Sequence, residues 1–364
     1  RVNKEGLIEV VSNNEPRIDF LNDSKGALLL EPSRSNLNDY SEDGTQWSVI
    51  NTTVSLDSSI SKPDGVLGAY KQTDDATDAQ HRVDVRRTVV NGTEYTFSAF
   101  VKKPSGSDIN FIYLLFSSTF STTRFYFNIE EGTSLDDGGT IENYGNGWYR
   151  VSATATANSD GNGILGVNLS NASNNNTYSG TGNGAMYVYG IQLEQGSYAT
   201  SYIPTQGSIG TRVAESCVQT PPSGIIGQTE GTMFCEVSGK SLQENSRYMS
   251  ISDFNDANKR LTIYQSGGLI NVYCSAGGGF NITYNPPAGP LKIAVGYKSG
   301  DYVLYVNGVN AATSTEIAVV ACSDLGLGVN EYLGTANPPS VGYSQAKLYN
   351  TRLSNAELQT LTQV

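Results

Sequence analysis

Histidine is almost absent from this sequence, which has one, His81, among 364 residues. A hydrolase that activates a serine or cysteine nucleophile with histidine would depend on that residue, and the G-x-S-x-G nucleophile elbow does not occur. A zinc site with several histidines is excluded by the count, and the four cysteines lack the paired spacing of zinc fingers. We therefore expect a protein without enzymatic activity.

Positive charge is also scarce in this chain. Lysine and arginine number 23 against 35 aspartates and glutamates, which gives a formal net charge of −12. An acidic chain repels phosphate backbones, so we expect no nucleic-acid partner. No apolar run approaches the roughly 20 residues that span a bilayer, so the sequence predicts no membrane insertion.

The four cysteines all lie in the C-terminal half of the chain. Cys235 and Cys274 alternate with apolar residues, which is the pattern of small core side chains on buried strands. A disulfide framework is the less favoured alternative, because the chain is long and poor in cysteine. Reduced thiols fit assembly in a bacterial cytoplasm.

The carboxylates form no familiar catalytic or metal-binding pattern. Acidic pairs such as Asp74-Asp75 are adjacent, and adjacent strand residues point to opposite faces, whereas a glycosidase needs two facing carboxylates. Asp253–Asn258 resembles the start of a calcium loop, but Ala257 and Asn258 stand where an oxygen ligand and a glycine belong. We expect no cofactor. An Asx-rich turn is favoured there, and a structural calcium ion is left open.

Glycine and tyrosine are abundant, at 39 and 22 residues, and short runs of alternating apolar residues recur along the chain. Such runs occupy residues 96–101, 124–129, 186–193 and 269–274, and turn-forming residues separate them. This pattern predicts antiparallel sheets packed as β-sandwiches or jelly rolls. A helical pattern occurs at Ser354–Thr362, where Ser354 and Glu357 form a capping box. We predict an all-β protein with one short C-terminal helix.

Composition also predicts the domain boundaries. We expect an N-terminal preamble or connector at residues 1–30 and a first β domain at 31–205. Glycines and a Pro-Pro pair predict a linker at 206–224, and a second β domain should occupy 225–364.

Tyrosine-rich and asparagine-rich β domains suggest glycan binding, because aromatic rings stack on the apolar faces of pyranoses beside polar groups. The alternative is that these rings pack in the core or at a subunit interface, since aromatic residues are enriched in any strand. The candidate glycan-binding residues, all in the first domain, are Trp47, Tyr70, His81, Tyr113, Arg124, Tyr126, Tyr187 and Tyr189.

Several segments resemble those of tailed-bacteriophage virion proteins of the tail-fibre or head-fibre type. The opening RVNKEGLIEVVSNNEPRIDF, then NGTEYTFSAFVKK and MYVYGIQLEQGSYATSYIPTQG, are similar to a connector followed by a carbohydrate-binding-module-like jelly roll in such proteins. The segments IIGQTEGTMFCEV, LKIAVGYKSGDYVLYVNGV and AKLYNTRLSNAELQTL resemble laminin-G-like, concanavalin-A-like domains. Arg1 then falls within a motif of those relatives, so we expect residues before it.

The resemblance implies a non-catalytic fibre or tail-tip component on the phage particle surface, assembled in the host cytoplasm. Its expected partners are host cell-surface polysaccharide and other virion proteins. Such appendages are usually homo-oligomers, with trimers favoured by analogy. Two alternatives stay open. One is a virion-associated polysaccharide depolymerase, and the other is a purely architectural decoration protein.

Overall fold

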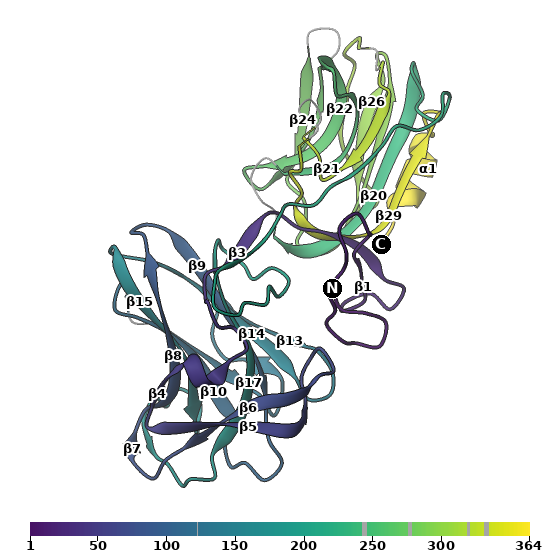
Figure 1. The fold of residues 1–364 in the computed structure, drawn as a ribbon. Helices are drawn as coiled ribbons and strands as arrows, with labels where there is room; N and C mark the ends of the chain where they lie inside the picture. Colours follow the sequence, from purple (N-terminus) through teal and green to yellow (C-terminus); the bar gives the residue numbers. More distant parts are fainter. Residues whose placement is uncertain (122, 242–245, 276–278, 319–320, 331–334) are drawn as a thin grey trace. The chain divides into compact units, whose positions relative to one another are not determined.

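The computed structural model describes residues 1–364 apart from 122, 242–245, 276–278, 319–320 and 331–334. Nearly all of its regular structure is strand in antiparallel sheets (Figure 1), which confirms the all-β prediction. The chain divides into two compact units. We call residues 2–10 and 34–212 the N-terminal sandwich, and residues 1, 11–33 and 213–364 the C-terminal sandwich.

Two six-stranded sheets, A and B, form the N-terminal sandwich. In spatial order, sheet A consists of β12 (Thr133–Ser134), β11 (Thr123–Asn128), β10 (Phe111–Ser117), β15 (Gly161–Ser170), β8 (His81–Val89) and β4 (Ser48–Ile50). Sheet B consists of β13 (Gly139–Asn143), β14 (Tyr149–Thr156), β9 (Glu94–Lys102), β17 (Ala185–Gln195), β6 (Leu67–Asp74) and β5 (Thr52–Ser61). Two short ladders pair β16 (Tyr178–Ser179) with β7 (Asp78–Ala79) and β18 (Gly210–Arg212) with β3 (Arg34–Asn36).

Alternation along the strands builds the core between sheets A and B. Phe97 and Val101 of β9 belong to this core, and Phe97 meets Phe116 of sheet A edge to face, with ring centroids 6.2 Å apart. The intervening Phe100 points to the other side of sheet B, since successive strand residues face opposite ways. There it contacts the ring of Tyr202 at 5.7 Å. Sheet B is therefore covered on both faces, which explains why every residue of β17 except Gln195 is buried.

The C-terminal sandwich contains a seven-stranded and a six-stranded sheet, C and D. In spatial order, sheet C consists of β1 (Ile18–Asp19), β2 (Ala27–Leu30), β29 (Ser340–Tyr349), β20 (Glu230–Ser241), β25 (Leu291–Lys298), β26 (Tyr302–Val306) and β27 (Val309–Ser314). Sheet D consists of β19 (Cys217–Gln219), β28 (Asp324–Leu327), β21 (Arg247–Asp253), β22 (Asp256–Ser266), β23 (Leu269–Cys274) and β24 (Phe280–Tyr284). Cys235 and Cys274 are fully buried in the core between these sheets, as their alternation predicts.

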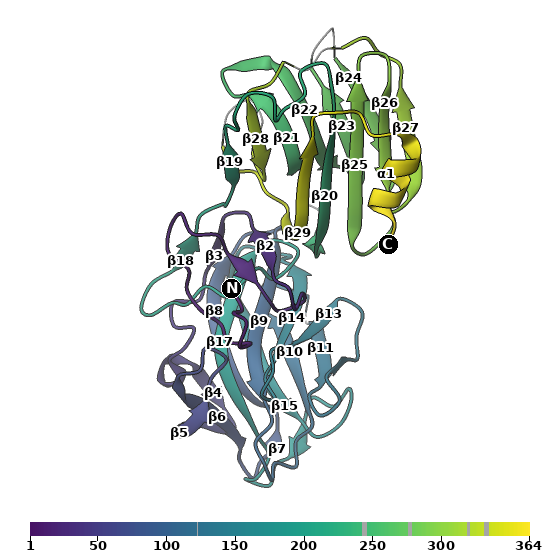
Figure 2. The same cartoon turned by 90° about the vertical axis from the view of Figure 1, so that its right-hand side faces the viewer.

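The one α-helix in the described residues, α1 (Asn355–Thr362), packs against β25, β26 and β27 of sheet C (Figure 2). Ser354 and Glu357 make the predicted capping box, and Leu358 is buried beside Phe234. This helix is not long and apolar enough to cross a membrane.

The compact units differ from the predicted domain ranges at two places. Residues 11–33 belong to the C-terminal sandwich rather than to a separate preamble, because β2 pairs with β29 through Leu28 and Tyr343. The expected linker at 206–224 contains β18 and β19, which hydrogen-bond to β3 and β28. Glycine and proline mark the turns in that segment. The strands between the turns have only three residues each, which is too short for an alternating pattern to predict them.

Candidate functional site

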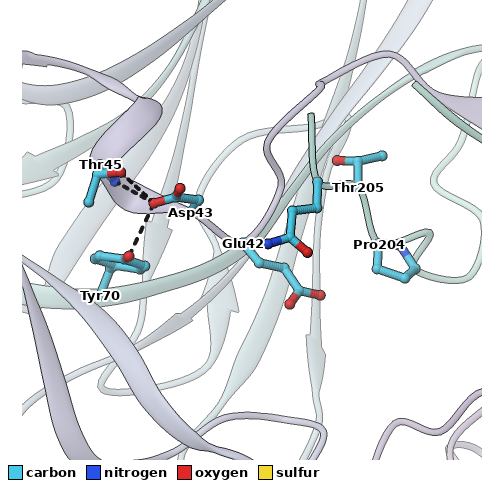
Figure 3. A pocket seen from close by; sticks show the side chains of 7 residues that line it. Glu42, Asp43, Thr45, Tyr70, Pro204 and Thr205 are labelled. Carbon is cyan, nitrogen blue, oxygen red and sulfur yellow. Dashed lines mark hydrogen bonds between the residues drawn. The ribbon is translucent and has the colours of Figure 1, made fainter. Parts of the chain in front are cut away.

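A surface pocket of about 540 Å³ lies in the N-terminal sandwich. Its walls come from the segment around the 3-10 helix η1 (Gly44–Gln46), from β6 and from residues 204–206 (Figure 3). This volume lies within the range of about 300–1,000 Å³ that is usual for ligand pockets. The lining residues are Glu42, Asp43, Thr45, Tyr70, Pro204, Thr205 and Gln206.

The aromatic wall of the pocket is the half-buried ring of Tyr70 on β6. The buried Trp47 supports this ring at a centroid distance of 5.8 Å, and the Trp47 indole nitrogen donates to the Tyr40 carbonyl oxygen at 2.9 Å. The backbone of Gly44 lies against the same ring, because a Cβ there would stand 2.5 Å from Tyr70 Cγ. Two fixed contacts therefore hold the Tyr70 ring in place at the pocket.

Asp43 supplies the first carboxylate of the pocket. It is the N-cap of η1, and its Oδ1 accepts hydrogen bonds from the Thr45 backbone nitrogen at 3.0 Å and the Thr45 hydroxyl at 2.6 Å. The Tyr70 hydroxyl donates to the same oxygen at 3.1 Å (Figure 3). These donors, the Thr45 hydroxyl first, lower the pKa of Asp43, so this carboxylate is ionised at neutral pH.

Glu42 supplies the second carboxylate. Its Oε1 accepts hydrogen bonds from the Tyr189 and Tyr202 hydroxyls, each at 2.9 Å. Burial raises the pKa of both phenols, so they stay protonated and act as donors. The Lys62 ammonium lies 4.0 Å from Glu42 Oε2, at the limit of an ion pair. The phenols of Tyr189 on β17 and of Tyr202, which follows β17, thus fix this carboxylate in position.

The opposite wall is the segment of Pro204, Thr205 and Gln206. Thr205 is anchored on both sides, because its hydroxyl donates to the Asn38 carbonyl oxygen at 2.6 Å and its backbone nitrogen donates to Ser41 Oγ at 2.8 Å. The Gln206 side chain is exposed beside it. None of the described residues lining the pocket is basic, so the pocket combines an aromatic ring, an amide and two carboxylates.

The structure separates the eight predicted glycan-binding residues. Trp47 and Tyr70 lie together at the pocket, and Tyr189 reaches it through Glu42. Tyr187 is buried on the same side of sheet B, where its hydroxyl donates to Asp57 Oδ2 at 2.7 Å. Trp47 and Tyr189 are themselves buried, so they support the pocket from behind.

Three more of the predicted residues share the outer face of sheet A. Tyr113 and Tyr126 pair across β10 and β11 with ring centroids 4.9 Å apart, and Arg124 lies on the same strand as Tyr126. These side chains share the outer face of the sheet, whereas their neighbours Leu114 and Phe125 belong to the core. Tyr113 is fully buried and Tyr126 nearly so, so a glycan contact by either ring is incompatible with this placement, whereas the half-buried Arg124 stays a candidate.

His81 is fully buried. Its Nδ1 faces the Asn51 carbonyl oxygen, and its Nε2 lies 3.1 Å from the Tyr178 carbonyl oxygen. The ring therefore joins two backbone segments and does not reach solvent. A ligand contact by His81 is incompatible with this placement, because no part of the ring is accessible.

Sequence reasoning missed Glu42, Asp43 and Gln206. The pattern Asp43-Gly44-Thr45 is a recognisable Asx-type cap, so a local signal for Asp43 exists. Glu42 and Gln206 are more than 160 residues apart, and no local pattern joins them.

Metal binding finds no support in the described part of the chain, where no group of three or more His, Cys, Asp or Glu residues could hold an ion. At the calcium-loop-like segment, the Asn255 and Asn258 backbone nitrogens donate to the side chains of Asp253 and Asp256 at 3.0 Å each. These are the expected Asx turns.

No protein-family model matches this sequence, and no curated protein does. Solved structures show similarity at low TM-scores. The CBM40 module of a Ruminococcus gnavus IT-sialidase, bound to α2,3-sialyllactose, is 17% identical with a TM-score of 0.34, over 38% of this chain and 84% of that chain. Domain 4 of a Geobacillus stearothermophilus extracellular arabinanase, in complex with arabinotriose, is 16% identical with a TM-score of 0.33. This match covers 43% of this chain and 73% of that chain. At these values neither likeness identifies a ligand for this chain.

Proposed function

We propose that this chain is a non-catalytic, glycan-binding component of a tailed-phage particle, and that the pocket around Tyr70 binds a neutral sugar. One observation carries the binding proposal: a half-buried tyrosine ring, supported from behind, stands beside two carboxylates and an amide in a pocket of about 540 Å³. Aromatic rings stack on pyranose faces, and carboxylates accept hydrogen bonds from hydroxyl groups. The virion setting is supported by the sequence segments that resemble phage fibre proteins.

The preference for neutral sugars follows from charge. Glu42 and Asp43 are two adjacent acids, and the Lys62 ammonium, 4.0 Å from Glu42, lies closer to Asp64, at 3.4 Å. A sugar carboxylate placed within 4 Å of such a group is repelled by about 1–4 kcal/mol, depending on exposure. A neutral sugar avoids this repulsion, and its hydroxyl groups can still donate hydrogen bonds to the two carboxylates.

The test uses purified protein, host surface polysaccharide and neutral oligosaccharides prepared from it. Binding is followed by titration calorimetry, and polysaccharide length by gel filtration. We expect binding without shortening, and a loss of at least about tenfold in affinity for Tyr70→Ala. The matched control is Tyr349→Ala, a half-buried tyrosine on β29 of the C-terminal sandwich.

Three outcomes overturn the proposal in different ways. Shortened polysaccharide would make the chain a depolymerase. Equal affinity of the Tyr70→Ala and Tyr349→Ala variants would remove the pocket as the binding site, and no binding at all would favour the architectural role.

A further inference from the structure

Asparagine followed by glycine occurs five times in the chain. The pairs are Asn91-Gly92, Asn146-Gly147, Asn162-Gly163, Asn183-Gly184 and Asn307-Gly308. In such a pair the backbone nitrogen of the glycine can attack the side-chain amide carbon of the asparagine, because glycine has no Cβ to obstruct the approach. The attack requires a glycine nitrogen without a hydrogen-bond acceptor and an asparagine side chain that can rotate. The folded structure therefore decides which of the five pairs can react.

Three of the pairs are held at the glycine. The Gly92 backbone nitrogen donates to the Ala157 carbonyl oxygen at 2.8 Å. The Gly184 backbone nitrogen donates to Asp74 Oδ1 at 3.1 Å. Gly163 is buried within β15, where it pairs with β8. In each pair the attacking nitrogen is bonded or enclosed by the sheet.

Asn307-Gly308 is held at both residues. The Asn307 Nδ2 donates to the Pro290 carbonyl oxygen at 3.1 Å, and its Oδ1 accepts from the Lys292 backbone nitrogen at 2.8 Å. The Gly308 backbone nitrogen donates to the Thr362 hydroxyl oxygen at 3.1 Å. Three hydrogen bonds must therefore break before the glycine nitrogen can reach the amide carbon of this asparagine.

Asn146-Gly147 lies at the tip of the hairpin between β13 and β14 and lacks such bonds. Both residues are exposed, and no described residue accepts from the Gly147 nitrogen or bonds to the Asn146 side chain. Close to this pair lies the flexible end of Lys102, since a Cβ at Gly147 would stand 3.6 Å from Lys102 Cε. The Asn146 side chain and the peptide that follows it can therefore rotate into the reactive geometry.

Backbone conformation does not separate these two turn pairs. Asn146 and Asn307 both have a positive φ, of 51° and 48°. Asparagine tolerates this left-handed region better than most residues, and rotation out of it relieves strain at either position. The difference in expected reactivity comes from the hydrogen bonds and from exposure, so Asn307-Gly308 is a matched internal control.

We propose that Asn146 is a site of spontaneous modification, at which asparagine becomes aspartate or isoaspartate. The Gly147 nitrogen loses its proton to solvent base and bonds to Asn146 Cγ, and the Cγ–Nδ2 bond breaks to release ammonia. Water then opens the cyclic succinimide. Cleavage of the new bond gives aspartate, whereas cleavage of the original peptide bond gives isoaspartate, in which the main chain runs through Cγ. Each event consumes one water and releases one ammonia.

The products change the hairpin in two ways. Both add a negative charge at its tip, and isoaspartate also lengthens the main chain between Gly145 and Trp148. These two residues are joined by a hydrogen bond of 2.8 Å from the Trp148 nitrogen to the Gly145 carbonyl oxygen, and Trp148 is buried. We therefore expect the modified chain to be more acidic and its N-terminal sandwich to unfold at a lower temperature.

The test incubates the full chain at mildly alkaline pH in water labelled with heavy oxygen and maps its peptides by mass spectrometry over time. We expect modification of Asn146 to be at least about tenfold faster than that of Asn307, because three hydrogen bonds protect Asn307-Gly308. One heavy oxygen atom should enter each product, since water opens the ring. Asn91 should react at an intermediate rate, because it is exposed but its glycine nitrogen is bonded.

Two controls separate structure from sequence. In guanidinium chloride the five pairs should react at similar rates, because folding no longer distinguishes them. Asn146→Gln should slow the reaction greatly at this position and leave the rate at Asn307 unchanged, since glutamine must close a larger ring. Equal rates at Asn146 and Asn307 in the folded chain would overturn the proposal. So would an intact Asn146 after a time in which the denatured chain has reacted, or a product without heavy oxygen.

Discussion

Replacing Gly44 by alanine tests whether the Tyr70 wall depends on a missing side chain. The new Cβ would stand 2.5 and 2.6 Å from Tyr70 Cγ and Cδ1 and 3.0 Å from Val54 Cγ1. Carbon atoms prefer separations of about 3.5–4.0 Å, so the ring must move by about 1 Å. Gly44 has no positive φ, so backbone strain does not contribute.

The expected cost follows from two opposing effects. Overpacking costs about 1–3 kcal/mol, and alanine recovers about 0.4–1 kcal/mol by restricting the unfolded chain. We expect a net loss of about 1–2 kcal/mol in the free energy of unfolding, measured by urea denaturation. Affinity for neutral sugar should also fall, because the displaced ring intrudes on the pocket.

A double-mutant cycle isolates the cause. Removing the ring leaves only the 3.0 Å contact with Val54 Cγ1, so Gly44→Ala should cost much less in a Tyr70→Ala background. If Gly44→Ala is as destabilising without the ring as with it, the contact with Tyr70 is not the reason. An unchanged stability in the single variant would refute the reasoning as well.

Three further predictions concern other parts of the chain. His81→Phe removes both ring nitrogens, which lie against the Asn51 and Tyr178 carbonyl oxygens, and should lower the free energy of unfolding by about 1–3 kcal/mol in urea titrations. A loss no larger than that of an exposed-site substitution would contradict this role. Ser59 and Tyr187 hydrogen bonds lower the pKa of Asp57 to about 2, below its unfolded value, so its stabilisation is present above pH about 4 and disappears as pH falls towards 2. Acid titration of the wild type and Asp57→Asn should differ in that window, and identical profiles would exclude the linkage. Cys217 is exposed, whereas burial raises the pKa of Cys235 and of Cys322 to about 12, so a thiol reagent should label Cys217 rapidly and the other cysteines only on unfolding.

Much of the architecture could be predicted because alternation is a local signal. Phe97 and Val101 reach the core as their spacing indicates, and Ser354 with Glu357 begins the helix as predicted. The same rule fails for β17, where Tyr187 and Tyr189 should face solvent but are buried. The segments around Glu42 and Tyr202 cover them, and no local pattern predicts which distant loop folds over a sheet.

The placement of the candidate residues was predictable in part for the same reason. Tyr113, Arg124 and Tyr126 share a face because strand periodicity places them there. Tyr70 was a candidate because of its residue type alone. The sequence did not identify its carboxylate neighbours, and only the cap pattern at Asp43 offers a local signal for one of them. A pocket whose walls come from residues 42–45, 70 and 204–206 depends on tertiary contacts that composition and spacing do not encode.

The pairing of β2 with β29 makes the N-terminal sandwich an insertion within the sequence of the C-terminal one. During synthesis, residues 34–212 emerge as one continuous segment and can fold at once. Residues 27–30 must wait for their partner strand β29, which is translated long after them. A fragment that starts at residue 225 would lack β2 and expose the backbone edge of β29 to other chains, which favours aggregation. A recombinant C-terminal sandwich therefore needs residues 11–33 joined to residues 213–364 by a short connection.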